Sequence, residues 1–161
     1  MRGLIGKRVL ITGGAGAIGS TAAARFLEEG CSVVVLDRDE AALERIEDEL
    51  TTLSGTIRAD VSDPDAVTRA FGELDQLVGG VDVLINNAGI SLRHRFLDIS
   101  PQAWHEVMKV NLDGVFLVAQ QAAQRMLAAD GGVILNMGST NGLMGYHYYA
   151  DYNASKAGVI E

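Results

Sequence analysis

The chain has 161 residues, of which 48% are hydrophobic, so it is long enough to bury a core as one domain over residues 1–161. Its formal net charge is −8 and its 13 basic residues are scattered, which argues against a nucleic-acid partner. Cys31 is the single cysteine, so no internal disulfide can form and we expect a cytoplasmic protein. Thr12 and four glycines interrupt the apolar N-terminal stretch, and we therefore expect neither a signal peptide nor a membrane partner.

Short apolar runs alternate along the chain with helical patterns, which is typical of a parallel sheet covered by helices on both faces. We therefore predict the α/β class. In chain order, the expected elements are a strand at 9–11, a helix at 18–29, a strand at 32–36, a helix at 40–50, a strand at 56–59, a helix at 63–77, a strand at 81–85, one long or two abutting helices at 101–126, a strand at 133–137 and a helix from about 151.

A glycine-rich turn follows the first predicted strand and opens the first predicted helix. Its pattern Gly14-x-Gly16-x-x-Gly19 matches a dinucleotide-binding fingerprint, in which the backbone approaches a pyrophosphate at a helix N-terminus. A turn of this kind can also serve close packing alone, and the motif by itself leaves that alternative open. The candidate cofactor-binding residues here are Gly13, Gly14, Gly16, Ala17, Ile18 and Gly19.

The second predicted strand ends in Leu36-Asp37, about 20 residues past the glycines, where a carboxylate would bind the adenosine ribose hydroxyls. Asp37 favours NAD, because its charge would repel a 2′-phosphate. Arg38 follows directly and could compensate, so NADP use stays open.

A third pattern joins Tyr152 to Lys156, four residues apart, with Ser139 thirteen residues before the tyrosine. On a helix, residues four apart share one face, so the ammonium can approach the phenol. Free tyrosine titrates near about 10, too high for a base at neutral pH, and a neighbouring cation favours the phenolate. The constellation indicates redox chemistry on an alcohol or carbonyl, although a solvated lysine beside a packed tyrosine would give the same spacing.

Taken in this order, the motifs resemble those of the short-chain dehydrogenase/reductase family in its compact, classical type, and the match covers nearly the whole chain. Three further motifs carry the resemblance: Asn86-Asn87-Ala88-Gly89 after the fourth predicted strand, the pair Asp60-Val61, and Asn111 within Val110-Asn111-Leu112. The sequence departs from the family at Ala17, where a glycine is usual.

The resemblance implies a Rossmann-like doubly wound parallel sheet and reversible hydride transfer between a nicotinamide cofactor and a secondary alcohol or ketone. It implies that Tyr152 is the acid or base, that Lys156 assists it and binds the nicotinamide ribose, and that Ser139 polarises the substrate oxygen. Asn111 would hold a water that links Lys156 to solvent. The family's cofactor contacts fall on Asp60, Val61, Asn87, Ala88 and Gly89, in addition to Tyr152 and Lys156.

The family continues beyond the Tyr-x-x-x-Lys helix into further strands and a substrate-binding segment, whereas this chain stops at Glu161. We therefore expect a sheet that is incomplete on its C-terminal side, with an unpaired edge beside the fifth strand. Family members usually form dimers or tetramers through long helices, so residues 101–126 are the expected contact surface of a homodimer or homotetramer.

Two groups of side chains remain without an assigned role. His94, His105 and His147 are far apart and have no cysteine near them, so we expect no metal site. The aromatic cluster Tyr146-His147-Tyr148-Tyr149 lies between Ser139 and Tyr152, and it either selects a substrate or packs against a second subunit.

Three functions are compatible with these observations. The first is an NAD-dependent dehydrogenase of a sugar, polyol or similar small alcohol, and the second an NADPH-dependent 3-oxoacyl-[acyl-carrier-protein] reductase. The third is a non-catalytic nucleotide-binding protein. The complete Ser, Tyr, Lys and Asn set argues against the third, and Asp37 favours the first.

Overall fold

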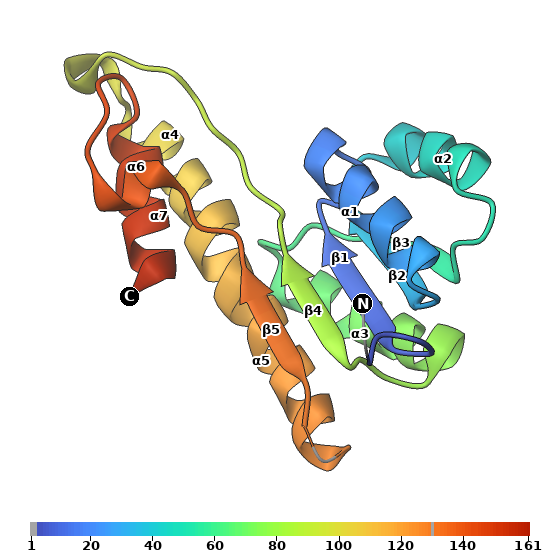
Figure 1. The fold of residues 1–161 in the computed structure, drawn as a ribbon. Helices are drawn as coiled ribbons and strands as arrows, with labels where there is room; N and C mark the ends of the chain where they lie inside the picture. The colour runs from blue at the N-terminus through green and yellow to red at the C-terminus, as the bar shows by residue number, and fades with distance from the viewer. Residues whose placement is uncertain (1–2, 130) are drawn as a thin grey trace.

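The computed structural model describes residues 3–129 and 131–161. Five parallel strands form one sheet in the order β3-β2-β1-β4-β5 (Figure 1). The α/β class and the doubly wound parallel sheet expected from the sequence are confirmed. The strands are β1 (Arg8–Thr12), β2 (Ser32–Asp37), β3 (Gly55–Arg58), β4 (Val83–Asn86) and β5 (Val133–Asn136).

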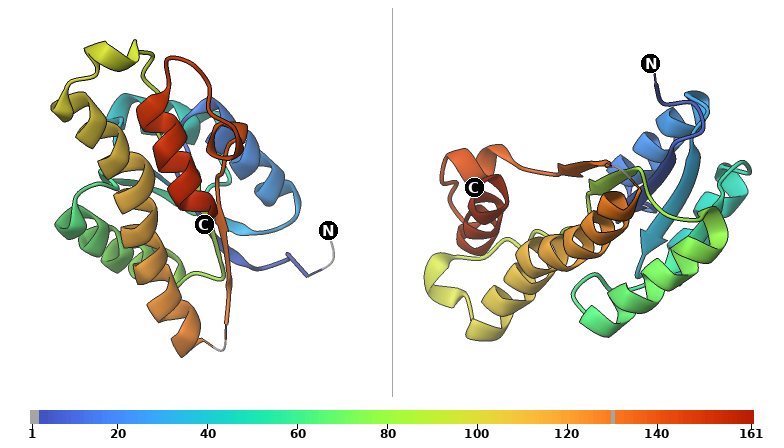
Figure 2. Two further views of the ribbon diagram at one scale, coloured as in Figure 1. Left: turned by 90° about the vertical axis from the view of Figure 1, so that its left-hand side faces the viewer. Right: turned by 90° about the horizontal axis from the view of Figure 1, so that it is seen from below.

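Helices cover both faces of this sheet because successive side chains of a strand point to opposite faces. In β1, Val9 and Ile11 belong to the core beneath α1 (Ala17–Glu28) and α2 (Glu40–Glu49). Leu10, between them, belongs to the core beneath α3 (Pro64–Val78) and α5 (Gly114–Ala128). The views in Figure 2 show these two helical layers on either side of the strands. Both faces of the central strands β1, β2 and β4 are buried, which explains why these strands are almost continuously apolar.

The ends of the helices follow local signals in the sequence. Asp39 caps α2 by accepting a hydrogen bond from the backbone N–H of Ala42, and Asp63 caps α3 just before Pro64. Gly79 ends α3 in the left-handed conformation, with a φ of +76°. These signals explain why the predicted helix bounds agree closely with the observed ones.

The long helical stretch expected at 101–126 is a continuous helix that consists of three segments. These are α4 (Pro101–Met108), a π-helical turn η2 (Lys109–Asp113) and α5. A π-helical turn inserts one extra residue per turn, often at a functional site, and here it contains Asn111. Two short elements were not predicted, η1 (Phe96–Asp98) and α6 (Thr140–Leu143), because neither is long enough to show a hydrophobic period.

The last helix, α7 (Ala150–Ile160), packs against α6, α4 and η2 and lies away from the strands (Figure 1). β5 is the edge of the sheet, and no described strand pairs with its outer side. Val133 and Leu135 of β5 are 59% and 46% exposed. Among the helices of residues 3–129 and 131–161, none has both the length and the apolar composition needed to cross a membrane.

Strand order places a crevice at the carboxyl ends of β1 and β4. The chain proceeds from β1 outward to β2 and β3, and then returns to β4 on the other side of β1. Ligands of open α/β sheets bind where the order reverses in this way. This topology therefore predicts a ligand site at this end of the sheet.

Candidate active site

The glycine turn after β1 is shaped by close approaches of the backbone. A Cβ added at Gly19 would lie 2.4 Å from the carbonyl oxygen of Gly13, and one at Gly14 would lie 2.7 Å from the side chain of Val35. Gly13 has a φ of +59°, and a Cβ there would lie 2.8 Å from the Cα of Ala88. These three glycines therefore bring the turn against β2, the start of α1 and the Ala88 segment.

The other half of the turn is open. Gly16 precedes α1 without a side-chain cap, and Gly16, Ala17 and Ile18 are exposed at the N-terminus of the helix. The N–H of Gly16 donates to the carbonyl oxygen of Gly13 at 3.2 Å, whereas those of Ala17 and Ile18 belong to the first turn of the helix, where the macrodipole favours an anion. The methyl group of Ala17, at the position where glycine was expected, lies on this exposed surface and has room there. The turn therefore fits a pyrophosphate group.

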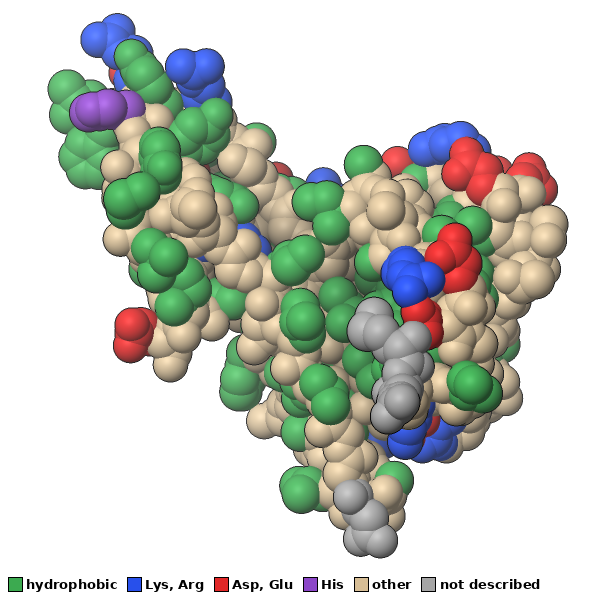
Figure 3. Space-filling model, in the orientation of Figure 1, with side chains coloured by type: hydrophobic (Ala, Val, Ile, Leu, Met, Phe, Trp, Pro, Cys, Tyr) green, Lys and Arg blue, Asp and Glu red, His purple; other side chains and the backbone are tan. Residues whose placement is uncertain are grey.

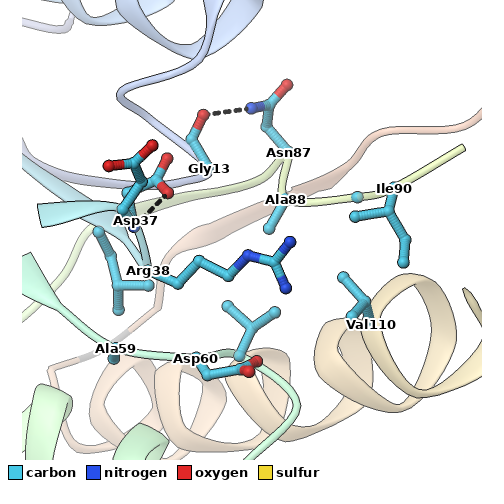
Figure 4. Close-up of a pocket in the computed structure, with 13 residues that line it drawn as sticks. Gly13, Asp37, Arg38, Ala59, Asp60, Asn87, Ala88, Ile90 and Val110 are labelled. Atoms are coloured by element: carbon cyan, nitrogen blue, oxygen red, sulfur yellow. Dashed lines mark hydrogen bonds between the residues drawn. The ribbon is translucent and has the colours of Figure 1, made fainter. Parts of the chain in front are cut away.

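A cavity of about 310 Å³ lies beside this turn, and Figure 4 shows the residues that line it. Asp37, at the end of β2, accepts a hydrogen bond from the N–H of Ala15 at 3.2 Å. Arg38 reaches across the cavity between Asp60 and Ala88. No described residue forms a hydrogen bond or an ion pair with its guanidinium. The sequence-predicted residues Gly13, Asp37, Arg38, Asp60, Val61, Asn87, Ala88 and Gly89 all line this one cavity.

Asp60 is held as a carboxylate on one wall of the cavity. Its burial favours the neutral acid, but hydrogen bonds from Ser62 and the charges of Arg38 and Lys109 outweigh burial and lower its pKa below the usual value. Its Oδ1 accepts a hydrogen bond from the N–H of Ser62 at 2.9 Å. A fixed acceptor is therefore available to a ligand in this cavity.

Thr12 ties the Asn87-Ala88-Gly89 segment to the glycine turn. Its buried hydroxyl oxygen accepts hydrogen bonds from the N–H groups of Asn87 and Ala88, both at 3.1 Å. The Asn87 amide in turn donates to the carbonyl oxygens of Thr12 and Gly13, each at 3.0 Å. The sequence analysis did not assign Thr12 a role in the site, and only the contact across β1 and β4 reveals it.

Asn111 is completely buried, and its side chain forms three hydrogen bonds. Its Oδ1 accepts from the N–H of Ile90 at 2.8 Å, while its Nδ2 donates to the carbonyl oxygen of Ile90 at 2.9 Å and to Ser155 Oγ at 3.1 Å. Ser155 donates in turn to the carbonyl oxygen of Tyr152 at 2.9 Å. Asn111 thus connects the segment after β4 to α7.

The side chain of Lys156, the next residue after Ser155 on α7, is also buried. Burial lowers the pKa of its ammonium below the usual value. Its Nζ lies 5.9 Å from the centre of the Tyr152 ring, so the two side chains share a helix face as predicted. The hydrogen bond of Nζ, however, goes to the carbonyl oxygen of Met137 at 2.6 Å, just beyond β5. Gly89 lies close by, since a Cβ built there would be 3.8 Å from Nζ.

Ser139 and Tyr152 come from the two segments that follow β5. Ser139 caps α6, and its Oγ accepts a hydrogen bond from the N–H of Asn141 at 3.1 Å. The phenol oxygen of Tyr152 forms no hydrogen bond with any described residue. No hydrogen bond joins Ser139 to Tyr152 in residues 3–129 and 131–161. Catalytic hydrogen bonds often form only once substrate is bound, so the phenol is available to an external oxygen.

A family model described as short chain dehydrogenase matches residues 7–161. The chain belongs to this family. The 3-oxoacyl-[acyl-carrier-protein] reductase of Aquifex aeolicus is 34% identical over 98% of this chain and 65% of its own length. The corresponding reductase of Staphylococcus epidermidis is 38% identical over 96% and 65%. The crystal structure of an NAD+-bound xylitol dehydrogenase superposes with a TM-score of 0.94 and 30% identity, over 99% of this chain and 63% of that chain.

The short-chain dehydrogenase family is thus confirmed, and the fold class agrees with its solved members. The chain spans 65% of the length of both reductases. Within the described residues, no three His, Cys, Asp or Glu side chains gather as metal ligands. Besides Thr12, the sequence analysis missed the contributions of Ser155, the Ile90 backbone and the Met137 carbonyl oxygen, all of which depend on long-range contacts.

Proposed function

We propose that this short-chain dehydrogenase transfers a hydride reversibly between a nicotinamide cofactor and the carbon of a secondary alcohol or ketone. The observation that carries the proposal is that Asn111 and Lys156 both approach Gly89, which lines the same cavity as Asp37, and that the Nζ of Lys156 lies 5.9 Å from the centre of the Tyr152 ring. The glycine turn fits a pyrophosphate, and the bound cofactor would accept or supply the hydride.

Each side chain would have a distinct physical role. Tyr152 would take the alcohol proton during oxidation and return it during reduction. Lys156 would favour the phenolate by its charge and bind the nicotinamide ribose. Ser139 would donate a hydrogen bond to the substrate oxygen, where negative charge develops during ketone reduction. Asn111 would position the Ile90 segment and Ser155, the neighbour of Lys156 on α7, through the hydrogen bonds described above.

NAD is the proposed cofactor, because the carboxylate of Asp37 would repel the 2′-phosphate of NADP. NADP is the alternative, and Arg38 is the observation in its favour. Its guanidinium lies in the same cavity without a hydrogen-bond partner and could bind a phosphate. The NAD+-bound xylitol dehydrogenase supports the first assignment by similarity.

The proposed substrate is a sugar, a polyol or a similar small alcohol. The second candidate is a 3-oxoacyl thioester, as in a 3-oxoacyl-[acyl-carrier-protein] reductase, and it is favoured by the two reductases that are 34% and 38% identical. We further propose a cytoplasmic homodimer or homotetramer. The exposed Phe116 of α5 supports the expected contact surface on the long continuous helix, since its side chain is 59% exposed.

The first experiment is a titration of the chain with NADH and, separately, with NADPH, followed by the fluorescence of the reduced nicotinamide. Tighter binding of NADH supports the assignment of Asp37, whereas binding of neither cofactor contradicts the proposal. Turnover is then measured with a panel of polyols and with an acetoacetyl thioester. Tyr152→Phe removes only the phenol oxygen, so it should abolish turnover and leave NADH binding unchanged.

Lys156→Met extends this experiment to the buried ammonium, with Lys7→Met, an exposed lysine far from the site, as the matched control. Lys156→Met should lower both turnover and NADH affinity, while the control variant should change neither. Full activity in Tyr152→Phe would refute the proposed acid–base role.

A further inference from the structure

Two loops meet at the end of the molecule beyond the candidate active site. One is residues 90–99, which follow the Gly89 segment, and the other is residues 144–149, which precede α7. The N–H of His94 donates a hydrogen bond to the carbonyl oxygen of Tyr148 at 3.0 Å. Figures 1 and 2 show the two loops side by side at this end of the chain. We call this pair of loops the tip.

Tyr148 holds an unusual backbone conformation at the centre of the tip. Its φ is +70°, and it is the sole non-glycine residue with a positive φ among those described. A side chain in this region is strained, and such strain is retained where the surrounding structure enforces it, often at functional sites. Tyr148 also lies next to Tyr149, whose ring meets that of Tyr152 edge-on at 6.4 Å. The tip is thus directly connected to the proposed acid–base residue.

The tip carries cationic and polar groups that lack partners. The Arg93 guanidinium carbon lies 5.0 Å above the centre of the Tyr148 ring. No described residue forms a hydrogen bond or ion pair with this guanidinium. His94 Nε2 is buried and also has no hydrogen-bond partner. A buried polar atom left in this way indicates a position that a ligand or a water molecule would satisfy.

The charge of the tip is opposite to that of the whole protein. With histidine neutral, the two loops carry Arg93 and Arg95 against one acidic residue, Asp98, in a chain of net charge −8. Asp98 lies 4.0 Å from Arg95, so Arg93 is the cation without an acidic partner. Figure 3 shows Lys or Arg, His and hydrophobic side chains gathered at this end. Among the exposed apolar groups are Phe96 and Leu97.

We propose that the tip binds a negatively charged group of the substrate, with the exposed guanidinium of Arg93 as the contact. This inference rests on the proposed function, because it assigns a substrate class to the same site. The Tyr148 ring keeps the guanidinium above one face and leaves its N–H groups free to hydrogen-bond a carboxylate or phosphate. Within the two candidate substrate classes, the substrate is accordingly one that carries a carboxylate or a phosphate, such as an acidic sugar derivative or a phosphorylated 3-oxoacyl thioester.

The test measures ketone binding in the presence of saturating NAD+, by isothermal titration calorimetry. Under these conditions the oxidised cofactor cannot reduce a ketone, so binding is read without turnover. The probes are acetoacetate, which carries a carboxylate, acetoacetyl phosphopantetheine, which carries a phosphate, and neutral methyl acetoacetate. The chains compared are the wild type, Arg93→Gln, Arg93→Lys and the control Arg45→Gln, which changes an exposed arginine of α2. Circular dichroism checks that each variant is folded.

We expect at least one anionic probe to bind the wild type about tenfold more tightly than the neutral ester, as a charge-assisted hydrogen bond predicts. Arg93→Gln should remove this preference, Arg93→Lys should retain most of it, and Arg45→Gln should retain all of it. The probe that binds identifies the anion as carboxylate or phosphate. Equal affinities for the three probes, a preference that survives in Arg93→Gln, or no ketone binding would overturn the proposal.

Failure of the proposed function gives a different result. In that case NADH does not bind or no hydride is transferred, while the anion preference and its loss in Arg93→Gln persist.

Discussion

Removal of the Asn111 amide provides a quantitative test of the network at the π-helical turn. Asn111→Ala deletes the three hydrogen bonds to the Ile90 N–H, the Ile90 carbonyl oxygen and Ser155 Oγ. Ser155 keeps its bond to the Tyr152 carbonyl oxygen. The two backbone groups of Ile90, however, lose their partner beside a fully buried position. The substitution therefore affects mainly the segment of Gly89 and Ile90, which lines the cavity.

A typical hydrogen bond contributes about 1 kcal/mol to stability, and a buried group left unpaired costs about 1–3 kcal/mol. Because water can enter the space left by the amide and satisfy part of the loss, we expect Asn111→Ala to reduce the free energy of unfolding by about 3 kcal/mol. For a chain of this length, this is a decrease in Tm of about 6–12 °C. NADH affinity should fall as well, since Gly89 and Ile90 are no longer fixed.

Urea unfolding followed by far-UV circular dichroism measures the first effect, and the nicotinamide fluorescence titration measures the second. Asn111→Asp is nearly isosteric but places an oxygen where the amide donated, so it should destabilise at least as much as alanine. Gln120→Ala removes an exposed amide of α5 and should change stability by less than about 0.5 kcal/mol. A loss below about 1 kcal/mol in Asn111→Ala would show that the network does not hold this region together.

Three further predictions concern the fold and the cofactor cavity. Hydrogen bonds from Arg8 hold the pKa of Asp82 at about 2. Because this is below the unfolded value of about 3.9, the carboxylate stabilises the folded protein above about pH 5, by about 1–2 kcal/mol for a pair partly open to solvent, and this contribution is lost as the pH falls toward 2. Asp82→Asn should abolish that part of the acid dependence of urea unfolding. Gly19→Ala places a Cβ within 2.4 Å of the Gly13 carbonyl oxygen, so it should reduce the free energy of unfolding by about 1–3 kcal/mol and weaken NADH binding. An unchanged NADH affinity would contradict the assignment of the turn. Asp37→Ala should shift the ratio of NADPH to NADH affinity toward NADPH by about tenfold in fluorescence titrations, since it removes one repulsive charge, and a constant ratio would contradict the cofactor assignment.

Much of the fold could be predicted because its signals are local. The strands β1, β2, β4 and β5 are short, mostly apolar runs, and α2 and α3 begin at Asp39 and Asp63, which cap the helices within the same few residues. The short helix α6 was missed, because four residues cannot display a helical period. The π-helical turn was also missed, since the pattern of α4 and α5 continues across it.

The candidate site was predicted less completely. The structure brings the glycine turn, Asp37 and Asp60 to one cavity, because in a parallel sheet the carboxyl ends of the strands meet at one edge. The sequence did not predict the partner of Lys156, whose hydrogen bond goes to the carbonyl oxygen of Met137, 19 residues away. A backbone carbonyl leaves no trace in the residue type, so no sequence pattern could have identified it.

The sequence by itself thus determined the order of strands and helices, the glycine turn and the shared helix face of Tyr152 and Lys156, because each depends on residues within one or two turns of the chain. Only the tertiary structure decided that Asn111 bonds to Ile90 and Ser155, and that Arg93 lies above the ring of Tyr148. These contacts join residues 21, 44 and 55 positions apart in the numbering. The physical reason is that such pairs form when the packing of α4, η2 and α7 fixes the distance between them.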